Sequence, residues 1–206
     1  MSWRPASDIT PDAPHITHTW APEPAAWTNG PADLTTNALR GFTREQDLAA
    51  TAYHEAGHAV VFTICGIAVD RIGFGDIAGL AGTTHLGRGP HPVSALLTGL
   101  SAGWRAEIRW LTESGLHTPE RAWAAERHAG TDQRAADALC REAFGEPLQY
   151  GKGPTHADWA SASEAADTIL GVRWGAVALL AEELVNRWLD SDYVMPGRQV
   201  HEFALS

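Results

Sequence analysis

The clearest pattern in the chain is a polar, imidazole-rich stretch, Tyr53–His58, that leads directly into the apolar run Ala59–Cys65. Thr43, followed three residues later by Gln46, matches a capping box and marks the start of a helix. Gly66 matches a helix stop. The change from polar to apolar residues predicts that this helix enters a hydrophobic core.

Two segments after this helix have the pattern of strands. Residues Ile67–Phe74 alternate between apolar and polar positions, and Thr83–Leu86 form a shorter stretch of the same kind. Glycines at 79 and 82 predict a turn between them. A small β-sheet is therefore expected.

The rest of the chain has helical periodicity. Pro119, preceded by Thr118, matches the first position of a helix, whereas Gly130–Asp132 predict an interruption. One more helical turn is expected from Met195 onward. Further helices are predicted at about 93–112, 133–144 and 157–189. The predicted fold class is mostly α (α+β).

Residues 1–42 differ in composition from the rest. They are rich in Pro, Thr, Ala and Asp and show neither helical nor strand periodicity. We expect an extended or partly disordered N-terminal arm, followed by one domain over residues 43–206. Trp3, Trp20 and Trp27 favour docking of the arm on the domain, over a cleft or on another subunit, and a flexible tail is the alternative.

Net charge and cysteine content indicate which partners and which cellular setting are expected. The 206 residues carry a formal charge of −10, which argues against nucleic acid and anionic membranes as partners. Two cysteines are too few for a disulfide framework, and Cys65 lies in the apolar run, so a cytoplasmic setting is expected. We expect neither a signal peptide nor a membrane span.

The motif His54-Glu55-Ala56-Gly57-His58 carries the candidate chemistry. Histidines four residues apart on a helix share one face, so both imidazoles can bind one Zn²⁺. Glu55 is offset by one residue, where it can take a proton from a metal-activated water. The alternative is an exposed polar helix, but burying these three side chains without a metal is costly.

A catalytic zinc site needs a third protein ligand. The extended H-E-x-x-H-x-x-G-x-x-H pattern is absent, because residues 61 and 64 are Val and Ile. Spacing alone leaves seven candidates, which are His85, Glu107, Glu113, His117, His128, Asp132 and Asp137.

Three segments resemble the FtsH-type zinc peptidases, the proteolytic half of the membrane-bound AAA proteases. Thr51–Val61 is similar to the zinc helix of that family. Gly103–Ile108 is similar to its G-R-x-A-E-E signature and departs from it at Trp104 and Ile108. Ala129–Ala136 is similar to a shortened form of its G-A-x-x-D segment. The resemblance covers most of the expected domain and implies a helical, zincin-like fold.

The resemblance implies roles for individual residues. His54, His58 and Asp132 would be the zinc ligands, and Glu55 the catalytic base. Glu107 would be a supporting carboxylate that orients a histidine through its second nitrogen. For Asp132, capping of a helix N-terminus is the alternative. The edge strand that pairs with substrate in this family corresponds to Gly82, Thr83, Thr84 and His85.

The expected function is that of a zinc metalloendopeptidase acting on flexible peptides or unfolded proteins. No G-x-x-x-x-G-K-[ST] loop is present, and the single lysine, Lys152, lacks the Ser or Thr that would follow it. ATP-independent cleavage is therefore expected. Two alternatives remain: a regulatory zinc-binding module that recognises peptides with a separate ATPase, and a zinc amidohydrolase acting on a non-peptide amide. Family members form hexameric rings, so a homo-oligomer is also an expectation.

Overall fold

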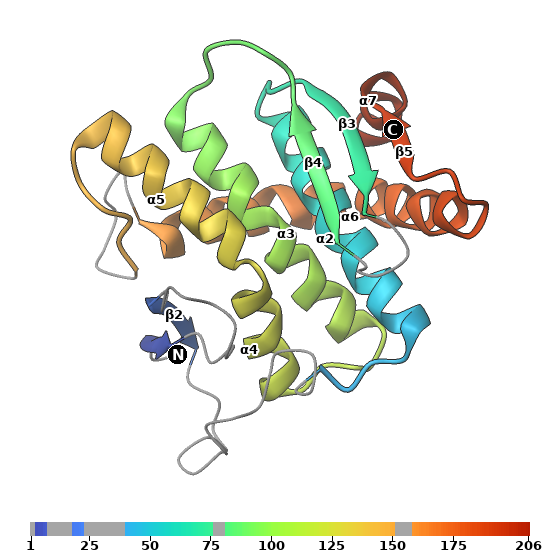
Figure 1. The fold of residues 1–206 in the computed structure, drawn as a ribbon, viewed down its shortest axis with the longest axis horizontal. Helices are drawn as coiled ribbons and strands as arrows, with labels where there is room; N and C mark the ends of the chain where they lie inside the picture. Colours follow the sequence, from blue (N-terminus) through green and yellow to red (C-terminus); the bar gives the residue numbers. More distant parts are fainter. Residues whose placement is uncertain (1–2, 8–17, 23–39, 76–80, 151–157) are drawn as a thin grey trace.

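Helices dominate the structure of the protein. A computed structural model describes residues 3–7, 18–22, 40–75, 81–150 and 158–206. In this part of the chain, one three-stranded antiparallel sheet lies along one side of the helices (Figure 1). The predicted class, mostly α (α+β), is therefore confirmed.

The first long helix, α2 (Arg44–Ile64), has the predicted boundaries. The Thr43 hydroxyl accepts a hydrogen bond from the Gln46 backbone N–H, and the Gln46 side chain accepts one from the Thr43 backbone N–H. At the other end Gly66 adopts a φ of 78°, and the Ile67 N–H returns to the Phe62 carbonyl at 2.9 Å. The capping box and the glycine stop are thus both confirmed.

Helix α2 lies in the centre of the molecule. It packs against α3 (Val93–Glu113) and α6 (Trp159–Leu189), and the buried side chains between them form the main hydrophobic core. Gly57 permits the close approach of α2 and α3, because a Cβ atom there would lie 2.5 Å from the Ala106 Cβ. The polar motif of α2 therefore faces α3 at short range.

The sheet lies beside α2 and has the strand order β4-β3-β5. The predicted strands are confirmed as β3 (Val69–Phe74) and β4 (Gly82–Leu86), which pair antiparallel. Residues 79 and 80, the first half of the turn expected from Gly79 to Gly82, lie outside the described residues.

The end of the chain differs from the prediction of one helical turn from Met195. It forms strand β5 (Val194–Pro196) and then helix α7 (Gly197–Ala204). A three-residue strand is too short to show alternation in sequence. It exists because Met195 pairs with Ile72 of β3 and is buried in the core.

Helices α4 (Pro119–His128) and α5 (Gly130–Phe144) follow each other almost without a break. Pro119 begins α4 as predicted, and Thr118 caps the helix by accepting a hydrogen bond from the Arg121 N–H. The interruption predicted at residues 130–132 is wrong, because these residues form the first turn of α5 and the break is Ala129 alone. Asp132 therefore projects from a helix and not from a loop.

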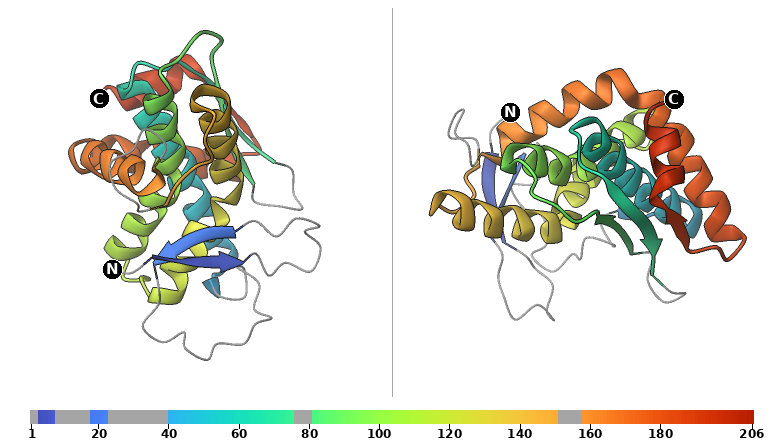
Figure 2. Two further views of the ribbon diagram at one scale, coloured as in Figure 1. Left: turned by 90° about the vertical axis from the view of Figure 1, so that its left-hand side faces the viewer. Right: turned by 90° about the horizontal axis from the view of Figure 1, so that it is seen from above.

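The described part of the N-terminal arm contains two short strands. Strands β1 (Trp3–Ser7) and β2 (His18–Pro22) pair antiparallel, and β2 lies beside α4 (Figures 1 and 2). Trp27 lies outside the described residues. Arg40, assigned to the arm by composition, is 3% exposed and belongs to the packed domain. The packing therefore begins before the predicted boundary at residue 43.

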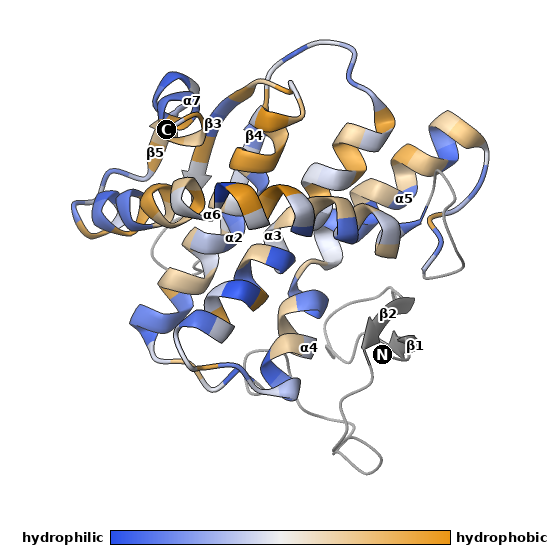
Figure 3. Ribbon diagram, turned by 180° about the vertical axis from the view of Figure 1, so that it is seen from behind, coloured by the Kyte–Doolittle hydropathy of each residue, from blue (hydrophilic) through white to orange (hydrophobic). Residues whose placement is uncertain are grey.

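Hydropathy along the helices shows no membrane span in the described part of the chain. None of its helices is both long and apolar enough to cross a bilayer. Figure 3 shows polar residues interspersed along the long helices α2, α3 and α6.

Candidate metal centre

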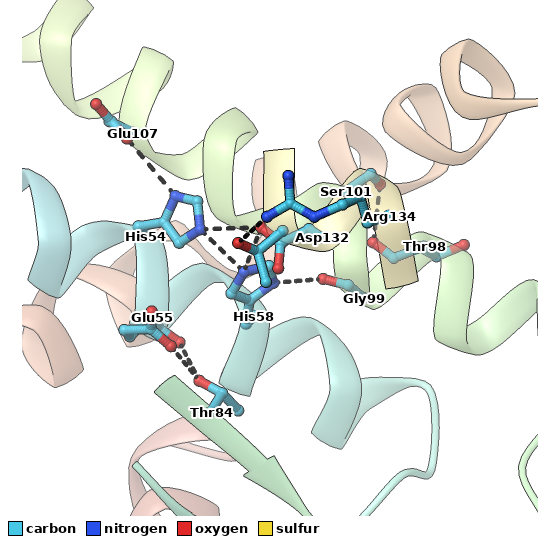
Figure 4. A network of polar contacts seen from close by, with 11 residues as sticks. His54, Glu55, His58, Thr84, Thr98, Gly99, Ser101, Glu107, Asp132 and Arg134 are labelled. Carbon is cyan, nitrogen blue, oxygen red and sulfur yellow. Dashed lines mark hydrogen bonds and ion pairs between the residues drawn. The ribbon is translucent and has the colours of Figure 1, made fainter. Parts of the chain in front are cut away.

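The two histidines of α2 form the base of the candidate site. His54 and His58 are buried one helical turn apart, and their Nε2 atoms lie 3.0 Å from each other. Both rings point toward the start of α5 (Figure 4). The predicted placement of the two imidazoles on one helix face is confirmed.

The Nδ1 atom of each ring points away from this centre, toward a neighbour on α3. His58 Nδ1 lies 2.8 Å from the Gly99 carbonyl oxygen, to which its N–H donates. His54 Nδ1 lies 3.6 Å from Glu107 Oε2. A histidine that binds metal through one nitrogen is oriented in this way by an acceptor at the other. Both Nε2 lone pairs are thus directed to a common point.

Asp132 supplies the third donor atom. Its Oδ2 lies 3.2 Å from His54 Nε2 and 3.3 Å from His58 Nε2. Of the seven candidates that spacing left open, Asp132 alone joins both histidines in a metal-binding group within the described residues. The alternative role of a cap is not realised, since the N-cap position of α5 is Ala129 and no side chain caps the helix.

The distances between these donors match a tetrahedral ion. Ligands bound to zinc at about 2.0–2.1 Å in tetrahedral geometry lie about 3.3 Å from one another. The three observed separations, 3.0, 3.2 and 3.3 Å, are close to this value. The group formed by His54, His58 and Asp132 could therefore hold a metal ion.

Gly103 of α3 keeps the space around the donors open. A Cβ atom at this position would lie 2.5 Å from His58 Nε2 and 2.6 Å from His54 Nε2. Real Cβ contacts are essentially never this short. Any other residue at position 103 would therefore push the two imidazoles apart or fill the space where they converge.

The pKa values of His54, His58 and Asp132 are shifted because the three side chains lie close together. Burial alone would lower the pKa of His54, but the nearby carboxylates of Asp132 and Glu107 outweigh burial and raise it to about 10. The pKa of His58 is also raised, because the attraction of Asp132 exceeds the cost of burial. Burial would raise the pKa of Asp132, and the two histidines instead hold it well below its usual range. The carboxylate of Asp132 therefore favours positive charge on the two histidines.

Metal binding near pH 7 is therefore expected to release protons from the histidines, at least the one that His54 holds. His54, with a pKa of about 10 in the metal-free protein, carries a proton at pH 7 that Nε2 must lose to become a ligand. Affinity should accordingly rise as the pH is raised toward 10. Calorimetric titration with zinc in two buffers of different ionisation enthalpy measures the release, and identical heats in both buffers would contradict it.

Glu55 lies beside the donors with its carboxylate held by β4. The Thr84 hydroxyl donates a hydrogen bond of 2.7 Å to Glu55 Oε2. Gly82, two residues earlier, gives the carboxylate room, because a Cβ atom there would lie 2.6 Å from Glu55 Oε1. The sequence placed both β4 residues on a substrate-binding edge and did not indicate that they hold Glu55.

These groups share one cavity of about 430 Å³. Its wall contains the three donor residues, Glu55, and Gly82, Thr83 and Thr84 of β4. His85, the fourth residue predicted on this edge, is not among the lining residues.

His128, at the end of α4, also lines the cavity. Its ring centre lies 6.4 Å from that of His54. Burial, and then the positive charge of Arg40, lower the pKa of His128 to about 4. It is therefore a neutral imidazole at pH 7, able to offer one N–H to a bound molecule.

Comparison with models of protein families and with curated proteins finds no match for this chain. Three converging donors, an adjacent carboxylate and an accessible cavity are the parts that a metal-dependent hydrolase requires.

Proposed function

We propose that this protein is a zinc-dependent metalloendopeptidase whose site is similar to that of the FtsH-type peptidases. One observation carries the proposal. The His54, His58 and Asp132 donors converge in the same cavity that holds Glu55 and the open edge of β4. Two nitrogen donors and one carboxylate oxygen form a donor set typical of catalytic zinc.

Each residue of the site would have its own role in peptide hydrolysis. When bound, zinc lowers the pKa of water and polarises a carbonyl group. Glu55 accepts the proton of the attacking water and passes it to the leaving amine. Thr84 holds the Glu55 carboxylate through Oε2. Oε1, which lies close to Gly82, is the oxygen left to carry the proton.

The free edge of β4 supports an extended peptide as the substrate. Within the described residues β4 pairs with β3 on one side, and its other side borders the cavity. The unpaired backbone groups of an edge strand can hydrogen-bond to an added strand. A substrate bound this way must be locally unfolded, because only an extended chain pairs along the edge.

Unfolded casein should be cleaved by the zinc-loaded protein without any nucleotide. The proposed site transfers protons and binds the backbone of the substrate, and neither step uses ATP. A chelator should stop cleavage, and added zinc should restore it. A tightly folded protein of similar size is the matched control and should survive. The proposal fails if zinc-loaded protein leaves casein and unstructured peptides intact, or if cleavage persists after the metal is removed.

A further inference from the structure

A buried ion pair lies directly behind the metal donors. Arg40 Nη2 lies 2.6 Å from Glu107 Oε1, and both side chains are almost completely buried. Glu107 belongs to α3, whereas Arg40 precedes α2 in a segment that composition alone assigned to the arm. Removing one partner of such a pair leaves an uncompensated buried charge, which is strongly destabilising for the arrangement around it.

The second oxygen of Glu107 connects this pair to a metal donor. Oε2 faces His54 Nδ1 at 3.6 Å, and neither atom has a closer hydrogen-bond partner. The guanidinium on Oε1 fixes the rotation of the carboxylate and so the position of Oε2. Arg40, Glu107 and His54 therefore form a continuous chain of contacts (Figure 4 shows its last step).

Arg40 is itself held from two sides. Its backbone carbonyl accepts a 2.8 Å hydrogen bond from Arg121 Nε, which belongs to α4. The guanidinium groups of Arg40 and Arg121 lie 5.0 and 5.1 Å from the centre of the Phe42 ring. Phe42 in turn meets Trp110 of α3 edge to face. These contacts fix residues 40–42 against α3 and α4.

We propose that Arg40 is a positioning residue of the metal site, which sets the orientation of His54 through Glu107. The segment before α2 is then part of the metal centre and not an appendage of the domain. The role rests on the proposed zinc site. The Arg40 guanidinium holds Glu107 through Nη2, and its Nη1 lies 3.8 Å from Asp47 Oδ1. The single ammonium of lysine does not reproduce this planar set of donors.

Zinc affinity of the full chain tests this role, measured by competition with a chromogenic chelator. Arg40→Met is expected to weaken binding by about 10–100-fold, the usual effect of losing a group that supports a ligand. Arg40→Lys should fall between the wild type and Arg40→Met. Arg187→Met, which breaks ion pairs with Glu183 and Asp192 on α6 and its following loop, is the matched control and should bind zinc normally.

A double variant separates positioning from general destabilisation. Because Arg40 acts through Glu107, Arg40→Met combined with Glu107→Gln should bind zinc no more weakly than Glu107→Gln alone. The visible spectrum of the Co²⁺-substituted protein should shift in Arg40→Lys even where its melting temperature is unchanged. This reports the ligand field and not the fold.

Each outcome decides the proposal. Wild-type zinc affinity in Arg40→Met, or losses that add in the double variant, would overturn it. If Arg40→Met does not fold, Arg40→Lys decides: weaker zinc binding with an altered Co²⁺ spectrum supports the role, and wild-type values refute it. A wild-type protein that binds no zinc would instead refute the proposed function, and the role of Arg40 would fall with it.

Discussion

Replacing Glu55 with glutamine is expected to lower the rate of peptide hydrolysis by about 10²–10⁴-fold, the usual contribution of a general base. Glutamine keeps the shape of the side chain and can still accept the hydrogen bond from Thr84, but it cannot take up a proton. Since Glu55 is not among the three metal donors, zinc content and melting temperature should stay close to those of the wild type. Cleavage of a fluorogenic peptide measures the rate, with zinc determined on the same samples.

A matched variant on the same helix controls for the loss of one negative charge. Glu45→Gln makes the same chemical change at an exposed position in the first turn of α2 and should retain full activity. Turnover by Glu55→Gln at the rate of Glu45→Gln would refute the role of Glu55. It would show that another group activates the water.

Gly103→Ala is expected to abolish zinc binding. The loss of zinc affinity should exceed the about 100-fold that follows from removing a residue that supports a ligand. The added methyl group would lie 2.5–2.6 Å from the Nε2 atoms of His58 and His54, so the imidazoles can no longer converge on one ion. The overpacking should also lower the free energy of unfolding by about 1–3 kcal/mol. Chelator competition and chemical denaturation measure the two effects.

Gly171→Ala supplies the control for Gly103→Ala. Gly171 also lies within a helix, but a Cβ atom there meets nothing within 4 Å. This variant should bind zinc normally and be more stable by about 0.4–1 kcal/mol, because alanine restricts the unfolded chain. Normal zinc affinity in Gly103→Ala would show that the ion is not held at the convergence of the two Nε2 atoms.

The parts of the site that lie within one helix could be predicted from the sequence. His54, Glu55 and His58 are related by helical spacing alone, and their helix has the local start and stop signals that the structure confirms. Asp132 lies on a different helix, and spacing left it among seven candidates. Its selection needed a resemblance to a known family, and the structure then placed it beside both histidines.

The parts that depend on close tertiary approach could not be predicted. Gly103 was visible as a motif glycine, but its function depends on how near α3 comes to α2. Arg40 lies in a proline-rich segment without periodicity, and nothing local shows that it meets Glu107, 67 residues away. Strand β5 exists only through pairing with β3. In each case the stabilising partner is remote in sequence. The local pattern of residues does not show which distant segment will come close.

The central claim is that His54, His58 and Asp132 together bind one zinc ion. Metal analysis of the purified wild type and of Asp132→Ala, with zinc affinities measured by chelator competition, tests it most directly. The wild type should hold one zinc per chain, and Asp132→Ala should lose most of its zinc and bind it markedly more weakly. Unchanged stoichiometry and affinity in Asp132→Ala would contradict the assignment and leave the two histidines without their third ligand.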